Sequence, residues 1–150
     1  MNRTNAGSTG RALRVFVSYA TSDRAYARQL ESLLSQRANL RVFTTDALSA
    51  GEDWERKLRD EIAQSDIFMV LLSPASVASK WVLHELGAAW AVKKPIIPVL
   101  TRPDLSTRIP MEFGDRKPID LNSLDTPEAI AQLLEPYAEP LRWSDKESVP

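Results

Sequence analysis

Short apolar runs alternate with segments of helical spacing along the central part of this 150-residue chain. The clearest run covers residues 67–72 (IFMVLL) and ends at Ser73-Pro74. It is far shorter than the roughly 20 residues that a membrane helix needs, and its length suits one strand buried on both faces. Such strands belong to parallel sheets that helices cover on both sides. The run therefore predicts an α/β domain.

The same signals recur before and after this run. Apolar and β-branched segments predict further strands at 15–17, 42–43, 96–100 and 118–121. Apolar residues at helical spacing, or helix-opening residues, predict helices from residue 22, from 54, over 80–92 and from 127. Five strands that alternate with helices predict a flavodoxin-like, three-layer α/β fold. Its five-stranded parallel sheet has the order 2-1-3-4-5, with helices on both faces.

One edge of such a sheet is the expected place for a ligand, because ligands bind outside the carboxyl ends of parallel strands. The residues that follow the first four strands are Ser18-Tyr19, Thr44 to Asp46, Ser73-Pro74 and Thr101-Arg102. Functional side chains are therefore expected in these segments and on the helices after them.

The two ends of the chain differ from this centre. Residues 1–12 are polar and are expected to be a disordered lead-in without the apolar region of a secretory signal, so a cytoplasmic protein is expected. The domain is expected over 13–138, a common size for one domain. Residues 139–150 are expected to be a tail or linker with Trp143 as the one large apolar anchor.

Composition excludes several classes of function. With 19 Lys and Arg against 20 Asp and Glu, the chain lacks the basic footprint of a nucleic-acid binder, and we expect no direct nucleic-acid or membrane partner. Cysteine is absent and His84 is the only histidine, which excludes thiol nucleophiles and multi-histidine metal sites. The turn at residues 18–23 has no glycine, so a phosphate loop and a dinucleotide fingerprint are absent. No metal and no bound cofactor are expected.

Glu85 is the most informative polar residue. Trp81 lies one turn before it and Ala88 and Ala89 one turn after it, so all share one helix face. A carboxylate in such surroundings is costly unless it is paired or functional. The ordinary alternative is a surface glutamate paired with a nearby Lys or Arg. The spacing alone leaves both interpretations open, and His84 is expected to point elsewhere.

Other residues have two interpretations as well. The segment 44–53 carries Asp46 and ends in Gly51-Glu52-Asp53, which is expected to cap the following helix whatever else the loop does. Tyr19 is either a half-buried aromatic residue or a stacking platform. Trp54 and Trp90 are expected to belong to the core.

Taken in order, these segments resemble the Toll/interleukin receptor (TIR) domain family. Residues 15–20 (VFVSYA) are similar to its first box, and Thr44 to Trp54 are similar to its second box, a loop used in self-association. Residues 70–74, followed by 79–86, are similar to the strand-to-helix segment of the NAD-consuming members. The resemblance covers roughly 13–134, and its most specific part is the Trp-x-x-x-Glu element formed by Trp81 and Glu85.

The resemblance implies cleavage of NAD⁺ at the bond between nicotinamide and ribose, with NAD⁺ as substrate rather than cofactor. Glu85 would be the catalytic glutamate. The candidate substrate-binding residues are Ser18, Tyr19, Ala20, Thr44, Asp46, Ser73 and Trp81. Many relatives have an arginine where this chain has Ala20, and the candidates for contacting the phosphates are Arg14, Arg24 and Arg102.

This chemistry suits a chain with few reactive side chains. The leaving group of NAD⁺ is a pyridinium, so nicotinamide departs neutral and needs no general acid, unlike ordinary glycoside hydrolysis with its two carboxylates. One carboxylate is enough to stabilise or trap the developing ribosyl cation.

The leading hypothesis is therefore a bacterial immune or toxin effector that forms ADP-ribose or a cyclic isomer. Self-association through the 44–53 loop would activate it, and a sensor domain, fused or separate, is a further expected partner. The alternative is a non-enzymatic adaptor or host-signalling mimic that docks to other TIR domains. A third hypothesis is a nucleoside-processing enzyme with a glutamate nucleophile.

Overall fold

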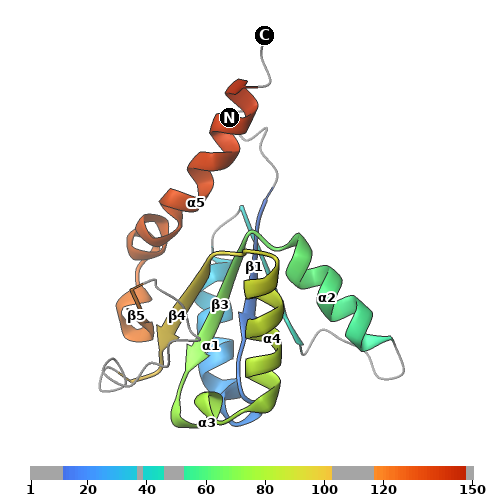
Figure 1. The fold of residues 1–150 in the computed structure, drawn as a ribbon. Coiled ribbons are helices and arrows are strands. Elements are labelled where there is room, and N and C mark those ends of the chain that lie inside the picture. The colour runs from blue at the N-terminus through green and yellow to red at the C-terminus, as the bar shows by residue number, and fades with distance from the viewer. Residues whose placement is uncertain (1–11, 37–38, 46–52, 103–116, 148–150) are drawn as a thin grey trace.

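Five parallel strands form the central sheet of the computed structural model, which describes residues 12–36, 39–45, 53–102 and 117–147. The strand order is β2-β1-β3-β4-β5, so the predicted fold class and order are confirmed (Figure 1). The strands are β1 (Leu13–Ser18), β2 (Leu40–Thr44), β3 (Ile67–Leu72), β4 (Ile96–Leu100) and β5 (Ile119–Asp120).

Helices cover both faces of this sheet (Figure 1). They are α1 (Arg24–Ser35), α2 (Trp54–Gln64), α3 (Pro74–Val77), α4 (Lys80–Ala91) and α5 (Pro127–Glu147), with 3₁₀ turns η2 (Thr21–Asp23) and η6 (Leu121–Leu124). In the described ranges, no helix is both long enough and apolar enough to cross a membrane.

Two hydrophobic cores lie on opposite sides of the sheet, and strands β1 to β4 contribute to both by alternation. Val15 and Val17 pack with α1 and α5, whereas Phe16 packs with α2 and α4. Phe16 stacks on Phe68 of β3, with ring centroids 5.4 Å apart and ring planes at 6°. Every residue of β3 is buried, which explains the uninterrupted apolar run at residues 67–72.

Two helices differ from the sequence expectations. A short helix, α3, precedes α4, because the Ser73 side chain accepts a hydrogen bond from the Ser76 backbone and the Ser76 side chain reciprocates, forming a capping box. Helix α5 begins at Pro127 as expected but continues to Glu147, so the segment expected to be a tail from residue 139 is helical over most of its length. The lead-in expected over 1–12 lies outside the described residues, apart from Ala12.

Trp54 and Trp90 are not core residues, and both expectations were wrong. Their exposed fractions are 46% and 71%. Trp90 follows the buried Ala89 and therefore lies about 100° around α4 from the face that packs on the sheet. Trp54 shares a face with the buried Leu58, but it is the first residue of α2 and packs against Trp81 instead.

Candidate active site around Glu85

Helix α4 places Glu85 beneath the protein surface. The Ser79 side chain starts the helix by accepting a hydrogen bond from the Val82 backbone at 3.2 Å. The buried residues of α4 are Val82, Glu85, Leu86 and Ala89, so one inward face includes a single carboxyl. Glu85 has an exposed fraction of 0%, and the alternative of a surface glutamate is therefore wrong.

The Glu85 carboxyl is held by one hydrogen bond. Ser18, the last residue of β1, donates its hydroxyl to Glu85 Oε1 at 2.6 Å, and both side chains are buried. Glu85 Oε2 has no hydrogen-bond partner within the part of the chain that the structure describes. A buried oxygen without a partner is costly, and the exceptions found in folded proteins call for an explanation such as a catalytic role.

Burial also changes the protonation of this group. Removal from water raises the pKa of Glu85 from 4.5 to about 8, and the hydrogen bond from Ser18 opposes this rise by favouring the anion. At neutral pH the carboxyl is therefore mainly protonated in the closed protein. A perturbed carboxyl of this kind is typical of functional sites.

The carboxyl edge of the sheet brings most of the candidate binding residues to one end of the domain. Ser18 pairs with Val70 of β3 in the sheet register, and Thr44 pairs with Val17. Ser18 and Ala20 lie on the side of the sheet that packs against α2 and α4, the side of Glu85. Asp46 lies outside the described residues.

Tyr19 has a different position from its two neighbours. It is 4% exposed and belongs to the core that α1 and α5 cover, on the other side of the sheet from Glu85. The interpretation as a half-buried ring is therefore wrong, and the buried ring does not face Glu85 as a stacking platform for a ligand would. The reason is the alternation along an extended segment, which sends Tyr19 to the face opposite that of Ser18 and Ala20.

A second polar contact ties two segments of this edge together. Ser73 follows β3 and donates its hydroxyl to the carboxylate of Asp23, and both side chains are buried. Asp23 is the N-cap residue of α1, but its side chain makes no capping hydrogen bond there. The carboxylate of Asp23 instead accepts from Ser73, the residue after β3, a contact that local sequence spacing does not reveal.

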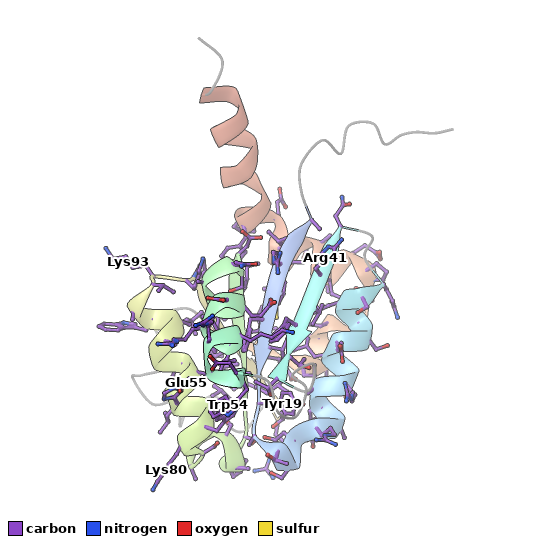
Figure 2. All side chains as sticks on the ribbon, turned by 90° about the vertical axis from the view of Figure 1, so that its right-hand side faces the viewer. Tyr19, Arg41, Trp54, Glu55, Lys80 and Lys93 are labelled. Atoms are coloured by element: carbon purple, nitrogen blue, oxygen red, sulfur yellow. The ribbon has the colours of Figure 1, made fainter. Side chains whose placement is uncertain are left out.

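Aromatic side chains from two helices meet near the start of α4. The half-buried Trp81 lies one turn before Glu85, and its ring centroid is 5.2 Å from that of Trp54. The Trp81 ring also stacks on the exposed His84, with ring centroids 6.4 Å apart and ring planes at 21°. Figure 2 shows Trp54 and Tyr19 toward the same end of the strands, with Arg41 toward the opposite end.

The candidate phosphate-binding arginines do not all lie at this edge. Arg14 is the second residue of β1 and pairs with Glu61 at 3.2 Å. Ser18 lies four positions farther along the strand, a rise of about 13 Å. The structure thus removes Arg14 from the candidates, whereas Arg24 at the start of α1 and Arg102 after β4 follow the carboxyl ends of their strands.

In the described ranges, no group of three or more His, Asp or Glu side chains is placed to hold a metal ion.

The sequence matches the family model for the TIR domain over residues 15–134. Comparison with curated proteins finds no match. Among solved structures, the TIR domain of the Toll-related receptor TRR-2 from Hydra magnipapillata superposes with a TM-score of 0.66 at 21% identity, covering 83% of this chain and 97% of that one.

Two further solved structures share the fold at lower similarity. The TIR domains of the activated Roq1 resistosome, which directly recognises the pathogen effector XopQ, give a TM-score of 0.53 at 20% identity, covering 89% of this chain and 80% of that one. The CMP N-glycosidase BcmB of Clostridium botulinum gives 0.51 at 20% identity, covering 81% and 98%. The family match spans most of the chain and the sheet order agrees with it, so this protein belongs to the TIR domain family.

Proposed function

We propose that this protein is an NAD⁺ nucleosidase that cleaves the bond between nicotinamide and ribose, by hydrolysis or by cyclisation. The observation that carries the proposal is the Glu85 carboxyl, buried at the carboxyl edge of the sheet. Ser18 holds its Oε1, and Oε2 has no partner among the residues that the structure describes. Membership of the TIR domain family and the nearby Trp81 support it.

The proposed reaction needs one carboxylate from the protein. The electron pair of the bond between C1′ and the ring nitrogen passes to that nitrogen, so nicotinamide leaves neutral and positive charge develops on the ribose. The Glu85 carboxylate stabilises this charge, and Ser18 orients it through Oε1. Water then attacks C1′ and gives ADP-ribose and a proton, or a nitrogen of the adenine ring attacks and gives a cyclic product.

Binding of a cationic substrate favours the charged form of Glu85. The carboxyl is mainly neutral at pH 7 because burial raises its pKa to about 8. A positive ring and a developing ribosyl cation beside it lower the pKa again, since an opposite charge favours the anion. The proton would leave the carboxyl when the substrate binds, so that the anion is present when the bond breaks.

The proposal includes activation by self-association. Glu85 is closed to solvent in this structure, so a substrate reaches it only when the surrounding groups move apart. We propose that assembly of TIR domains through the 44–53 loop drives this opening; residues 46–52 of that loop lie outside the described residues. The assembled TIR domains of the Roq1 resistosome support such a mode of action. The biological role proposed is that of a bacterial, cytoplasmic antiviral or toxin effector controlled by a sensor domain.

Nicotinamide release from concentrated protein tests the catalytic assignment. Wild type is expected to release nicotinamide, and Glu85→Gln is expected to reduce the rate at least about 100-fold, since it removes the charge that stabilises the transition state. Glu55→Gln changes an exposed glutamate of α2 and is expected to match wild type. Full activity of Glu85→Gln would refute the assignment.

The same assay separates the proposal from its alternatives. Absence of nicotinamide release by wild type, even on a surface that clusters the protein, would favour a non-enzymatic adaptor that docks to other TIR domains. Release of free base from neutral nucleosides but not from NAD⁺ would favour a nucleoside-processing enzyme.

A further inference from the structure

Strand β2 forms an outer edge of the sheet. It has one neighbour in the strand order, β1, and no described strand pairs with its other side. Figure 2 looks at the sheet from this side, with β2 between α2 and α1. An edge strand offers unpaired backbone N–H and C=O groups that can pair with a further strand. This edge is therefore a place where another polypeptide can bind.

The hydrogen bonds to β1 show which backbone groups of β2 are available. The Leu13 N–H donates to the Asn39 carbonyl at 2.8 Å, so the backbone of Asn39 faces β1. Successive residues of a strand direct their backbone groups to opposite sides, and those of Leu40 and Val42 therefore point away from β1. These two residues can hydrogen-bond to an added strand.

A cleft opens beside this edge, on the side of the sheet that α2 covers. It is lined by residues of three elements, among them Arg14 of β1, Arg41 and Phe43 of β2, and Glu61 and Ser65 near the end of α2. Arg14 and Arg41 are partners in the sheet register, so their side chains leave the sheet on the same face. Both are the second residues of their strands, whereas Ser18 binds Glu85 at the carboxyl end of β1. The cleft is thus separate from the candidate active site.

The two arginines give the cleft an excess of positive charge. Arg14 pairs with Glu61 at 3.2 Å. Arg41 is exposed, and its side chain has no hydrogen-bond or ion-pair partner among the described residues. Like charges side by side on neighbouring strands are unfavourable. A carboxylate from a bound molecule would relieve this repulsion, because guanidinium groups bind carboxylates through paired, charge-assisted hydrogen bonds.

We propose that this edge binds an extended acidic segment of a partner protein, which adds to the sheet as a strand beside β2. Hydrogen bonds to the backbone of Leu40 and Val42 hold the strand, and side chains at alternate positions decide which strand is accepted. On the α2 side, Arg41 selects Asp or Glu, and Phe43 selects an apolar side chain two positions away. The site is independent of the proposed nucleosidase.

The charge of Arg41 makes this edge selective. Charged side chains on edge strands prevent indiscriminate pairing between sheets. Arg41 repels a basic strand and gives a neutral strand no charge partner, whereas an acidic strand gains an ion pair. A small anion such as phosphate carries the complementary charge but cannot pair with the backbone of Leu40 and Val42. An extended acidic segment uses both features of the edge, which is why we favour it.

Two peptides that differ in one charge test the proposal. Each is blocked at both ends, carries fluorescein and has about nine residues, within the usual length of a strand. Both alternate valine and threonine and carry a leucine two positions after the central residue, which is glutamate in one peptide and lysine in the other. Fluorescence polarisation measures binding to the full chain. The glutamate peptide is expected to bind at least about tenfold more tightly, because it replaces repulsion by charge-assisted hydrogen bonds.

Charge reversal in the protein provides the matched comparison. Arg41→Glu is expected to reverse the preference, so that the lysine peptide binds more tightly. Arg59→Glu makes the same change of charge at an exposed residue of α2 that does not line the cleft, and it is expected to keep the wild-type preference. Far-ultraviolet circular dichroism and melting temperature show whether each variant is folded. The peptide pair tests the wild-type chain even if Arg41→Glu does not fold.

Amide hydrogen exchange, measured by nuclear magnetic resonance, shows whether the peptide adds as a strand. The N–H groups of Leu40 and Val42 are expected to exchange at least about tenfold more slowly with the glutamate peptide bound, and that of Arg41, which faces β1, is expected to change little. Equal affinity for the two peptides, or binding without protection of Leu40 and Val42, would overturn the proposal.

Other occupants of the edge give different results. If neither peptide binds, binding of inorganic phosphate would assign the cleft to small anions. A dimer of the free protein that Arg41→Glu dissociates would assign the edge to a second copy of the chain. Either result contradicts the proposal, and neither affects the release of nicotinamide that tests the nucleosidase.

Discussion

At the scale of single residues, burial of the Glu85 carboxyl makes stability fall as pH rises. The pKa of this group is raised from 4.5 to about 8 in the folded protein because of desolvation. Between these two values the unfolded chain has lost the proton and the folded chain keeps it, so the free energy of unfolding decreases with pH. The decrease is of order 5 kcal/mol at most and is complete above the folded pKa.

Glu85→Gln removes this titration and retains the size of the side chain. The melting temperature of the variant minus that of wild type is therefore expected to increase from about pH 5 to about pH 8.5, because wild type alone loses stability over this range. Differential scanning calorimetry at both pH values provides the measurement, with Glu55→Gln as the control at an exposed site. A difference that does not change with pH would contradict the burial of a protonated carboxyl.

At the scale of elements, Ser73 connects three segments that meet at the carboxyl edge. Its hydroxyl oxygen caps α3 by accepting from the Ser76 backbone at 3.0 Å, and its proton is donated to Asp23, the last residue of η2 before α1. Ser73→Ala is expected to lower the free energy of unfolding by about 2–3 kcal/mol, since it removes a cap and leaves a buried carboxylate without this donor. Urea unfolding measures the loss.

The comparison for this prediction is Ser79→Ala, which removes a cap of α4 at 3.2 Å. Its expected cost is about 1 kcal/mol, the usual value for a helix cap. Equal losses in the two variants would show that the contact between Ser73 and Asp23 adds no stability beyond capping.

At the scale of the whole molecule, the closed position of Glu85 leads us to expect activity only in the assembled state. The proposed function predicts that nicotinamide release per mole of protein increases with protein concentration, or when the chain is clustered on a surface, because a 0% exposed carboxyl needs a rearrangement to meet a substrate. Steady-state rates over a hundredfold range of concentration, alongside sedimentation of the same samples, test it. A constant rate per mole from a monomer would exclude activation by self-association.

The strands could be predicted from the sequence because their signals are local, and their order followed from the fold class that the alternation predicts. The apolar run at 67–72 and the alternation of strand and helix patterns fix a covered parallel sheet. Helical spacing also placed Glu85 on an apolar face of its helix, since residues four apart lie together on any α-helix. The position of a strand and the apolar face of a helix depend on periodicity within one element. They can therefore be predicted without knowing which other elements pack against it.

Tertiary packing decided the rest. The bond from Ser18 to Glu85 and the bond from Ser73 to Asp23 join residues far apart in the sequence, so no local pattern specifies them. Trp54 has the spacing of a core residue, yet it is exposed because its helix starts there and a second helix supplies its partner. The sequence by itself thus determined which elements form and which face of each is apolar. Only the packing of one element on another decided which polar atoms are satisfied and which aromatic rings stay exposed, because burial depends on what lies opposite a side chain.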